Sequence, residues 1–176
     1  MTPSVAKITL VLGGARSGKS RYAESVIAGL PPPWVYVATA EPGDDEMASR
    51  IATHRSRRDS NWRTVEAPRD LAAALDKCAP APVLVDCLTL WLSNLLLAEA
   101  EADIDMEIAR LEKALASMTA PVVLVANEVG SGIVPEHPLG RRFRDLQGLL
   151  NQRMAARADR VVLMVAGLPL AVKGTL

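Results

Sequence analysis

The sequence predicts an α/β fold in which helices cover both faces of a mostly parallel β-sheet. Short apolar runs rich in Val, Ile and Leu recur along the chain, and such runs are typical of strands buried on both faces. Segments of helical composition separate these runs, and strand alternating with helix is the signature of right-handed βαβ units. No repeat or low-complexity linker interrupts the pattern. We therefore expect a three-layer sandwich that forms a single domain over residues 1–176.

The expected elements follow from these runs in order. Five apolar runs predict buried strands, at residues 8–12, 35–38, 83–85, 122–126 and 161–165. Residues 62–66 alternate weakly and predict another strand, and Pro169 is expected to turn the chain into a short antiparallel edge strand at 170–173. Six segments between them predict helices, at residues 20–30, 44–58, 70–78, 88–100, 105–118 and 140–158.

Composition and charge exclude several classes of protein. Hydrophobic residues make up 49% of the 176 residues and charged residues 23%, which is globular composition. The 20 Lys and Arg balance the 20 Asp and Glu, so the general attraction of a nucleic-acid binder is missing, and we expect no nucleic-acid partner.

The sequence also bears on location and on cysteine chemistry. The longest apolar stretch, residues 161–172, is shorter than the roughly 18 residues of a bilayer span and contains Gly167 and Pro169. With no membrane span and no secretory signal, we expect a cytoplasmic protein. Cys78 and Cys87 lie in no CxxC or zinc-ligand spacing, so two buried thiols are expected.

A phosphate-binding motif follows the first predicted strand. The run is Gly13-Gly14-Ala15-Arg16-Ser17-Gly18-Lys19-Ser20, which is G-x-x-x-x-G-K-[ST] between a strand and a helix. Its backbone N–H groups can surround a phosphate, Lys19 can reach the β and γ oxygens, and Ser20 is placed to ligate Mg²⁺. The alternative is a glycine turn with an incidental lysine. The motif indicates a P-loop NTPase, and we expect the three-layer sandwich to be RecA-like.

An acidic residue for the metal is expected at the end of another strand. The run at 83–85 ends in Asp86, which we interpret as the Walker B carboxylate. The competing interpretation is a cap for the helix that starts near Leu88. Asn127 follows the strand at 122–126 but lacks the Lys and Asp of the guanine-reading N-K-x-D motif, so the sequence shows no ordinary GTPase base reader.

One of the two histidines lies among arginines. If the segment is helical from Asp44, then Arg50, Arg57 and Arg58 lie about one turn from His54. Guanidinium groups would lower the histidine pKa and bind phosphate oxygens, as a nitrogen nucleophile at phosphorus requires. Periodicity alone favours the alternative, in which His54 packs beside Met47 and Ile51.

The remaining basic residues carry less information. His137 lies in a proline-bounded loop, where a surface position is the default. The arginine-rich run at 141–145 could be a nucleic-acid patch, yet aromatic residues are only 3% of the chain. The simpler interpretation is a helix with a charged face that lines a site or a subunit contact.

Several motifs together resemble one family, and they run almost end to end. They are G-G-A-R-S-G-K-S-R at 13–21, Y-V-A-T-A at 36–40, R-I-A-T-H-R at 50–55, V-D-C-L-T at 85–89 and N-E-V-G-S-G-I-V-P at 127–135. The chain resembles the bifunctional adenosylcobinamide kinase/adenosylcobinamide-phosphate guanylyltransferases of cobalamin biosynthesis. The first motif is common to many enzymes, whereas the R-I-x-x-H-R and N-E-V-G-x-G-I-V-P runs are specific to this family.

The resemblance implies a two-step enzyme. ATP or GTP would phosphorylate adenosylcobinamide, and GTP would then donate GMP to adenosylcobinamide phosphate through a guanylylated histidine, which matches His54 here. It also implies nucleotide contacts at the phosphate loop and at Ala38, Thr39, Ala40, Arg55, Ser56, Arg57, Arg58, Glu66 and Asp86. Mg²⁺ and a homotrimer with sites near subunit contacts are implied as well.

Two other classes of function stay open at this point. A P-loop kinase of another small metabolite would release ADP without forming a covalent protein–GMP. A non-catalytic nucleotide switch would hydrolyse slowly and need a partner protein, and the missing base-reading motif counts against it.

Overall fold

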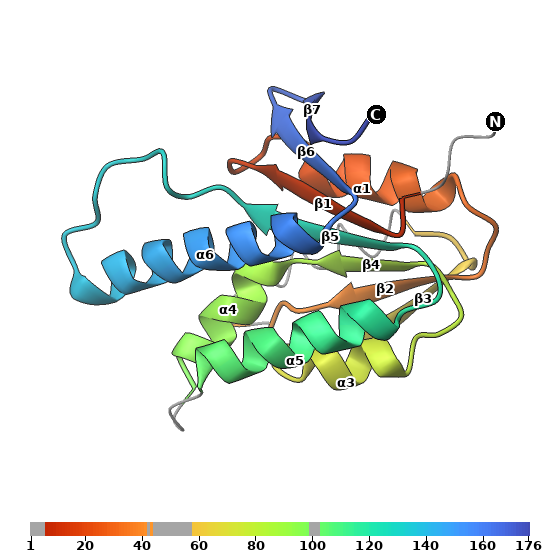
Figure 1. Ribbon diagram of the computed structural model, residues 1–176, viewed down its shortest axis with the longest axis horizontal. Helices are drawn as coiled ribbons and strands as arrows, with labels where there is room; N and C mark the ends of the chain where they lie inside the picture. The colour runs from red at the N-terminus through yellow and green to blue at the C-terminus, as the bar shows by residue number, and fades with distance from the viewer. Residues whose placement is uncertain (1–5, 42, 44–57, 99–102) are drawn as a thin grey trace.

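The computed structural model describes residues 6–41, 43, 58–98 and 103–176. Within them lies a seven-stranded sheet of order β3-β2-β4-β5-β1-β6-β7 (Figure 1). Its strands are β1 (Ile8–Gly13), β2 (Trp34–Ala38), β3 (Trp62–Glu66), β4 (Val83–Asp86), β5 (Val122–Asn127), β6 (Arg160–Val165) and β7 (Leu168–Lys173). The first six strands are parallel, and β7 runs antiparallel to β6 at the edge. The predicted mostly parallel sheet with an antiparallel edge strand is confirmed.

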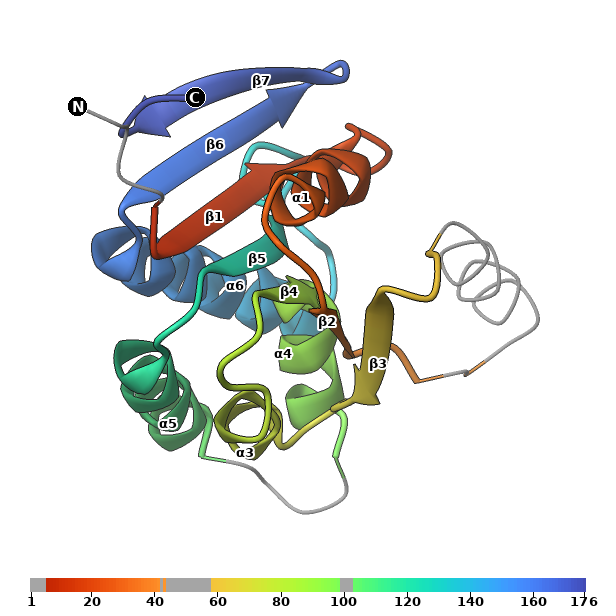
Figure 2. The same cartoon turned by 90° about the vertical axis from the view of Figure 1, so that its right-hand side faces the viewer.

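Helices lie on both faces of the sheet. They are α1 (Lys19–Ala28), α3 (Leu71–Asp76), α4 (Leu88–Leu96), α5 (Ile104–Ser117) and α6 (Pro138–Arg157). Figure 2 shows α1 on one face of the sheet and α3, α4, α5 and α6 on the opposite face. The described part of the chain therefore forms the expected three layers.

The central strands explain the continuous apolar runs of the sequence. Leu10 and Leu124 belong to the larger core, beneath α3 to α6, whereas Val11 and Val125 belong to the core beneath α1. Successive side chains of a strand point to opposite faces, so both faces of β1 and β5 must be apolar.

The helix ends differ from the expected ones by a few residues. Helix α5 begins at Ile104, because the Asp103 carboxylate accepts a hydrogen bond from the Met106 N–H at 3.0 Å and so caps it. Helix α6 begins two residues earlier than expected, at Pro138, a residue suited to a first helical position. Helix α4 ends at Leu96 and so stops short of the expected end. The helix expected at 44–58 lies outside the described residues except for Arg58, which is not helical.

The pairing of the strands brings several predicted nucleotide-site residues together at the carboxyl edge of the sheet. Ala38 pairs with Glu66 on one side and with Asp86 on the other, and Gly13 pairs with Asn127. These residues end their strands, and ligands of open parallel sheets bind beyond the carboxyl ends. Among the described residues, no helix combines the length and apolarity needed to cross a membrane.

Candidate functional site

The phosphate loop connects β1 to α1 in a conformation that its glycines permit. Gly13 has a φ of +152° and Gly18, the N-cap of α1, a φ of +93°, which L side chains rarely adopt. The Lys19 side chain folds back over the loop, and its Nζ donates a hydrogen bond to the Gly14 carbonyl at 2.5 Å. Gly14, Ala15 and Arg16 stay exposed at the tip of the loop. The loop thus presents backbone N–H groups and one ammonium at the carboxyl edge of the sheet.

Lys19 lies close to the acidic end of β4. The residue is only 8% exposed, and burial lowers the pKa of its ammonium. Cys87 and the Asp86 carboxylate act in the opposite direction and raise this pKa. The predicted lysine and the predicted carboxylate therefore belong to one site.

Asp86 ends β4 and is held by a tyrosine. The Tyr36 hydroxyl donates a hydrogen bond to Asp86 Oδ2 at 3.1 Å. The N-cap of α4 is Cys87, which counts against the helix-cap interpretation of Asp86.

The loop after β2 is tied to the start of α4. Thr39 is fully buried, and its hydroxyl donates to the Cys87 carbonyl at 2.7 Å and accepts from the Cys87 N–H at 2.8 Å. The Asn94 amide donates to the Thr39 carbonyl at 2.8 Å and to the Pro68 carbonyl at 2.9 Å. The hydroxyl and carbonyl of Thr39 thus make hydrogen bonds within the protein that hold this loop. The sequence gives only a weak signal for Asn94, an amide within an otherwise apolar helix.

An aromatic cluster lies on the face of the sheet that α1 covers, with Trp34 and Trp62 at the amino ends of β2 and β3. The guanidinium carbon of Arg58 lies 3.6 Å from the centre of the Tyr36 ring. Trp62 packs edge-on to that ring, with ring centres 6.4 Å apart, and Trp34 lies 5.2 Å from Trp62. Burial, followed by the charge of Asp86, raises the pKa of the Tyr36 hydroxyl, which therefore stays protonated. Among the described residues, the buried Nη1 of Arg58 has no hydrogen-bond acceptor.

The turn between β6 and β7 packs against the phosphate loop, which the sequence did not predict. Its residues Ala166 and Gly167 have φ values of +51° and +84°. Pro169, which was expected to make this turn, lies in β7 and pairs with Met164, because an edge strand tolerates a residue without an N–H. The Gly167 N–H donates to the Ser17 carbonyl at 3.1 Å, and a Cβ on Gly18 would lie 3.4 Å from the Gly167 Cα. The edge hairpin therefore supports the loop from the side.

The structure describes most of the predicted site residues. Ser20 is half-buried at the start of α1, Ala38 and Ala40 are half-buried beside Thr39, and Glu66 is exposed at the end of β3. Four predicted residues lie outside the described residues: His54, Arg55, Ser56 and Arg57. Their roles stay predictions.

Several arginines of α6 are engaged with neighbouring protein groups, whereas Arg142 is exposed. Arg141 donates to the carbonyls of Pro135 and Glu136 at 3.0 and 2.6 Å, and Arg153 pairs with Glu112 at 2.8 Å. His137 is exposed as expected. The charged-face interpretation of this helix is therefore favoured over a nucleic-acid patch.

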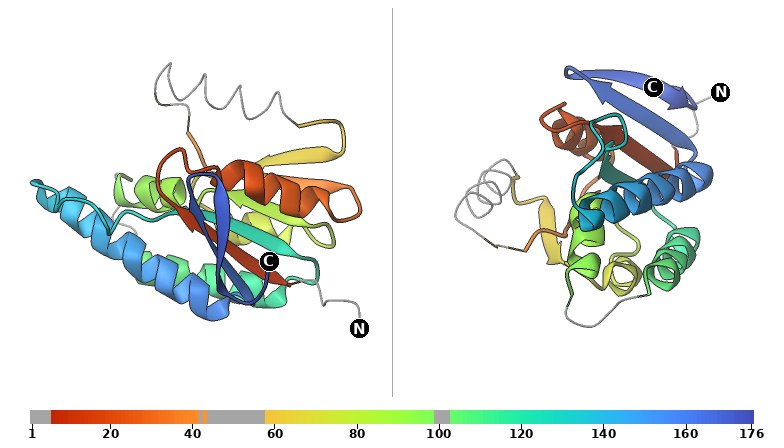
Figure 3. Two further views of the ribbon diagram at one scale, coloured as in Figure 1. Left: turned by 90° about the horizontal axis from the view of Figure 1, so that it is seen from above. Right: turned by 90° about the vertical axis from the view of Figure 1, so that its left-hand side faces the viewer.

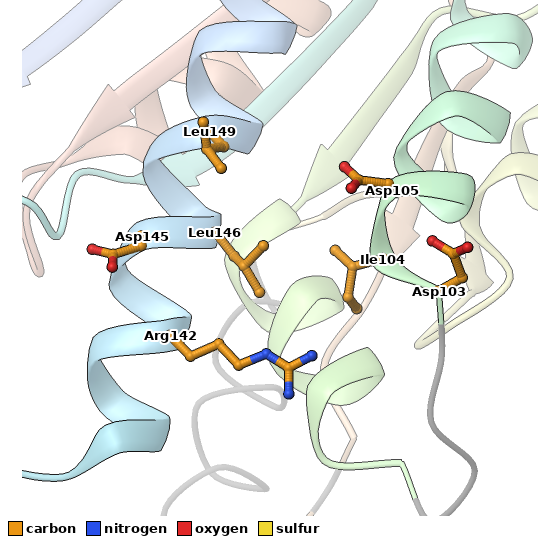
Figure 4. A pocket seen from close by; sticks show the side chains of 7 residues that line it. All are labelled: Asp103, Ile104, Asp105, Arg142, Asp145, Leu146 and Leu149. Carbon is orange, nitrogen blue, oxygen red and sulfur yellow. The ribbon is translucent and has the colours of Figure 1, made fainter.

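A shallow pocket lies between α6 and the N-terminal end of α5 (Figure 4). Ile104, Leu146 and Leu149 line it, and its polar groups are the side chains of Asp103, Asp105, Arg142 and Asp145. It lies away from the phosphate loop, and nothing in the sequence predicted it.

The described residues offer few side chains that could bind a metal ion. Within the described ranges no three His, Cys, Asp or Glu side chains cluster so as to hold a metal ion. Mg²⁺ often takes only one or two protein oxygens, with waters and substrate phosphates completing its shell. The hydroxyl of Ser20 and the carboxylate of Asp86 are oxygen donors of that kind. The donor set fits Mg²⁺ bound together with a nucleotide.

Comparison with known proteins gives consistent matches in sequence. The family model described as cobinamide kinase / cobinamide phosphate guanyltransferase matches residues 9–172. The bifunctional adenosylcobalamin biosynthesis protein CobP of Pseudomonas aeruginosa is 50% identical over 167 residues, which cover 94% of this chain and 96% of the relative. The corresponding CobU protein of Salmonella typhimurium is 45% identical over 179 residues, covering 93% and 98%.

Solved structures show the same fold at low sequence identity. The flagellar accessory protein FlaH of Methanocaldococcus jannaschii aligns with a TM-score of 0.54 and 10% identity, over 95% of this chain and 78% of FlaH. An ATPase from a bacterial type III secretion system aligns with a TM-score of 0.56 and 12% identity, over 94% and 56%. These likenesses confirm the RecA-like P-loop NTPase fold.

Proposed function

The chain belongs to the cobinamide kinase / cobinamide phosphate guanyltransferase family, and we propose that both reactions use the nucleotide site at the carboxyl edge of its sheet. It is an enzyme of cobalamin biosynthesis with the two activities of that family. In the first reaction, ATP or GTP phosphorylates adenosylcobinamide. In the second, GTP donates GMP to adenosylcobinamide phosphate, giving adenosylcobinamide-GDP and pyrophosphate.

The proposal depends chiefly on the proximity of Lys19 and Asp86 at the carboxyl edge of the sheet, where the carboxylate is close enough to raise the pKa of the lysine. A triphosphate bound along the loop would receive hydrogen bonds from backbone N–H groups, and Lys19 would exchange the Gly14 carbonyl for phosphate oxygens. Fixed positive charge and oriented donors lower the barrier to phosphoryl transfer chiefly by positioning and by electrostatic stabilisation.

The hydroxyl of Ser20 and the carboxylate of Asp86 would hold Mg²⁺ in this site. The ion would neutralise charge on the triphosphate. One carboxylate oxygen of Asp86 already accepts from Tyr36, and a carboxylate offers roughly four acceptor positions, so the residue can serve both partners.

The guanylyl transfer is assigned to His54. An imidazole nitrogen attacks the α-phosphorus of GTP, and the bond from that phosphorus to the pyrophosphate oxygen breaks. An oxygen of adenosylcobinamide phosphate then attacks the same phosphorus and displaces the histidine. Two displacements divide one difficult transfer into two easier steps.

The nucleotide contacts implied by the family complete this proposal. They are Ala38, Thr39, Ala40, Arg55, Ser56, Arg57, Arg58 and Glu66. Arg58 supports it best, because its buried Nη1 finds no acceptor among the described residues and a phosphate oxygen would supply one.

We further propose a homotrimer and a cytoplasmic location. Figure 3 shows the N-terminal half of α6 projecting beyond the sheet. Leu139 and Leu149 of this helix are 50% and 54% exposed, and exposed apolar side chains on a projecting helix suit a subunit contact. Sedimentation of the purified protein tests the trimer.

A labelling experiment tests the proposed function. The parent protein, His54→Ala and the control His137→Ala are incubated with Mg²⁺ and GTP labelled at the α-phosphate. We expect an acid-labile, alkali-stable label on the parent and on His137→Ala, and none on His54→Ala. If no protein becomes labelled although GTP binds, the transfer through a guanylylated histidine is wrong. A protein that also releases no adenosylcobinamide-GDP would then be a P-loop kinase without nucleotidyl transfer.

A further inference from the structure

Tyr36 joins two opposite charges across the site edge. Its hydroxyl donates to Asp86 Oδ2 at 3.1 Å, while the Arg58 guanidinium carbon lies 3.6 Å from its ring centre. Tyr36 pairs with Leu84 in the sheet register, two residues before Asp86, so its side chain reaches along the face that α1 covers. The Tyr36 side chain thus links β2 to β4 through Asp86 and to Arg58, which precedes β3.

The ring itself is firmly held. Tyr36 is 5% exposed, and Trp62 packs against it edge-on. Because Trp62 and Arg58 both pack against this buried ring, the ring has little rotational freedom and its hydroxyl stays in one place. A phenylalanine would fill the same volume without the hydroxyl, so packing alone does not explain a tyrosine here.

We propose that Tyr36 is a positioning residue that orients the Asp86 carboxylate for Mg²⁺ and couples this orientation to Arg58. A carboxylate held in one rotamer loses less freedom when it binds a cation. The cation on the ring face is attracted to the aromatic ring and braces it from the other side. The inference rests on the proposed function, because it assigns Asp86 to the metal of a bound nucleotide.

Calorimetric titration of a non-hydrolysable GTP analogue, once in EDTA and once in Mg²⁺, tests this role. The variant is Tyr36→Phe, and the matched control is Tyr22→Phe, which removes the hydroxyl of the other tyrosine of the chain. We expect Tyr36→Phe to bind the analogue as the parent does in EDTA. The factor by which Mg²⁺ increases the affinity should be about tenfold smaller in the variant, which is the size of a hydrogen bond to a charged group. Tyr22→Phe should keep the full gain. An unchanged gain in Tyr36→Phe overturns the proposal.

A second measurement separates positioning from a general structural effect. In an Asp86→Ala background, Tyr36→Phe should add no further loss of the Mg²⁺-dependent gain, because the hydroxyl then has no carboxylate to orient. An additional tenfold loss would mean that Tyr36 acts elsewhere. Arg58→Gln should reduce the gain by about threefold, the size of a cation–π contact. If Arg58→Gln kept the full Mg²⁺-dependent gain, Arg58 would have no part in orienting Asp86.

These outcomes differ from a failure of the proposed function. The titrations use neither cobinamide nor turnover. If the parent protein formed no cobinamide product and yet showed the tenfold effect, the reaction assignment would be wrong and the role of Tyr36 would hold. If both reactions proceeded while Tyr36→Phe bound like the parent, only the role of Tyr36 would be wrong.

Discussion

A Cβ atom on Gly13 would lie 2.7 Å from the carbonyl oxygen of Met164, so the phosphate loop and β6 meet without room for a side chain. The same Cβ would lie 2.7 Å from Ser17 Oγ within the loop. The first glycine of the motif is therefore fixed by packing between neighbouring strands as well as by its backbone angle.

Gly13→Ala should lower the free energy of unfolding by about 3 kcal/mol, because backbone must shift and φ is +152°. Thermal unfolding followed by circular dichroism measures this. Gly14→Ala is the control, since nothing lies within 4 Å of its added Cβ. Equal stability of the two variants would contradict the packing argument.

Lys19→Met should reduce both reactions by about a hundredfold or more, because it removes a donor aimed at the phosphates. Its stability should not fall, since an apolar side chain of similar length replaces a buried ammonium. Initial rates and unfolding curves measured on one preparation check both statements. A fall in activity accompanied by loss of folding would instead indicate a structural role.

Thr39→Val should lower the free energy of unfolding by about 2 kcal/mol. The substitution keeps the shape but leaves the Cys87 N–H and carbonyl without the Thr39 hydroxyl. Thr39→Ser keeps the hydroxyl and should lose less. Chemical denaturation of the two variants provides the comparison, and a greater loss in Thr39→Ser would show that the methyl group matters more than the hydroxyl.

The pair of Glu112 and Arg153 should make stability depend on acid pH. The hydrogen bond from Arg153 is the main cause that lowers the pKa of Glu112. The folded protein therefore binds this proton less readily than the unfolded chain. The resulting stabilisation is present above the ordinary glutamate pKa and is lost as pH falls through the lowered folded value.

Melting temperatures of the parent and Glu112→Gln, measured from about pH 7 down to about pH 2, test this dependence. The two curves should differ at neutral pH and converge in acid. Glu136→Gln, which changes an exposed carboxyl, should follow the parent. Parallel curves for the parent and Glu112→Gln would show that the ion pair contributes nothing.

The sequence predicts the local parts of the site because each is a short pattern. The phosphate loop follows a strand, and Asp86 ends another, so a parallel sheet must bring them to the same edge. The contacts of Tyr36 with Asp86 and of Asn94 with Thr39 could not be predicted in this way. Each joins residues about fifty positions apart, and its existence depends on sheet register and on the placement of α4.

The hairpin against the phosphate loop shows the same limit. The short edge strand was expected, but the turn into it was expected at Pro169 and lies instead at Ala166 and Gly167. That the turn reaches Ser17 follows only from β6 pairing beside β1, which no local pattern of the sequence specifies.

The position of β1 in the sheet has a consequence for the growing chain on the ribosome. Ile8 pairs with Val122 on one side, and Thr9 pairs with Arg160 on the other. The strand that carries the phosphate loop is thus synthesised well before both of its neighbours in the sheet. Such distant pairings fold slowly, so we expect the loop to reach its folded conformation only after β5 and β6 have left the exit tunnel. We therefore expect fragments truncated before β6, in which β1 lacks one of its two neighbours, to lose nucleotide binding.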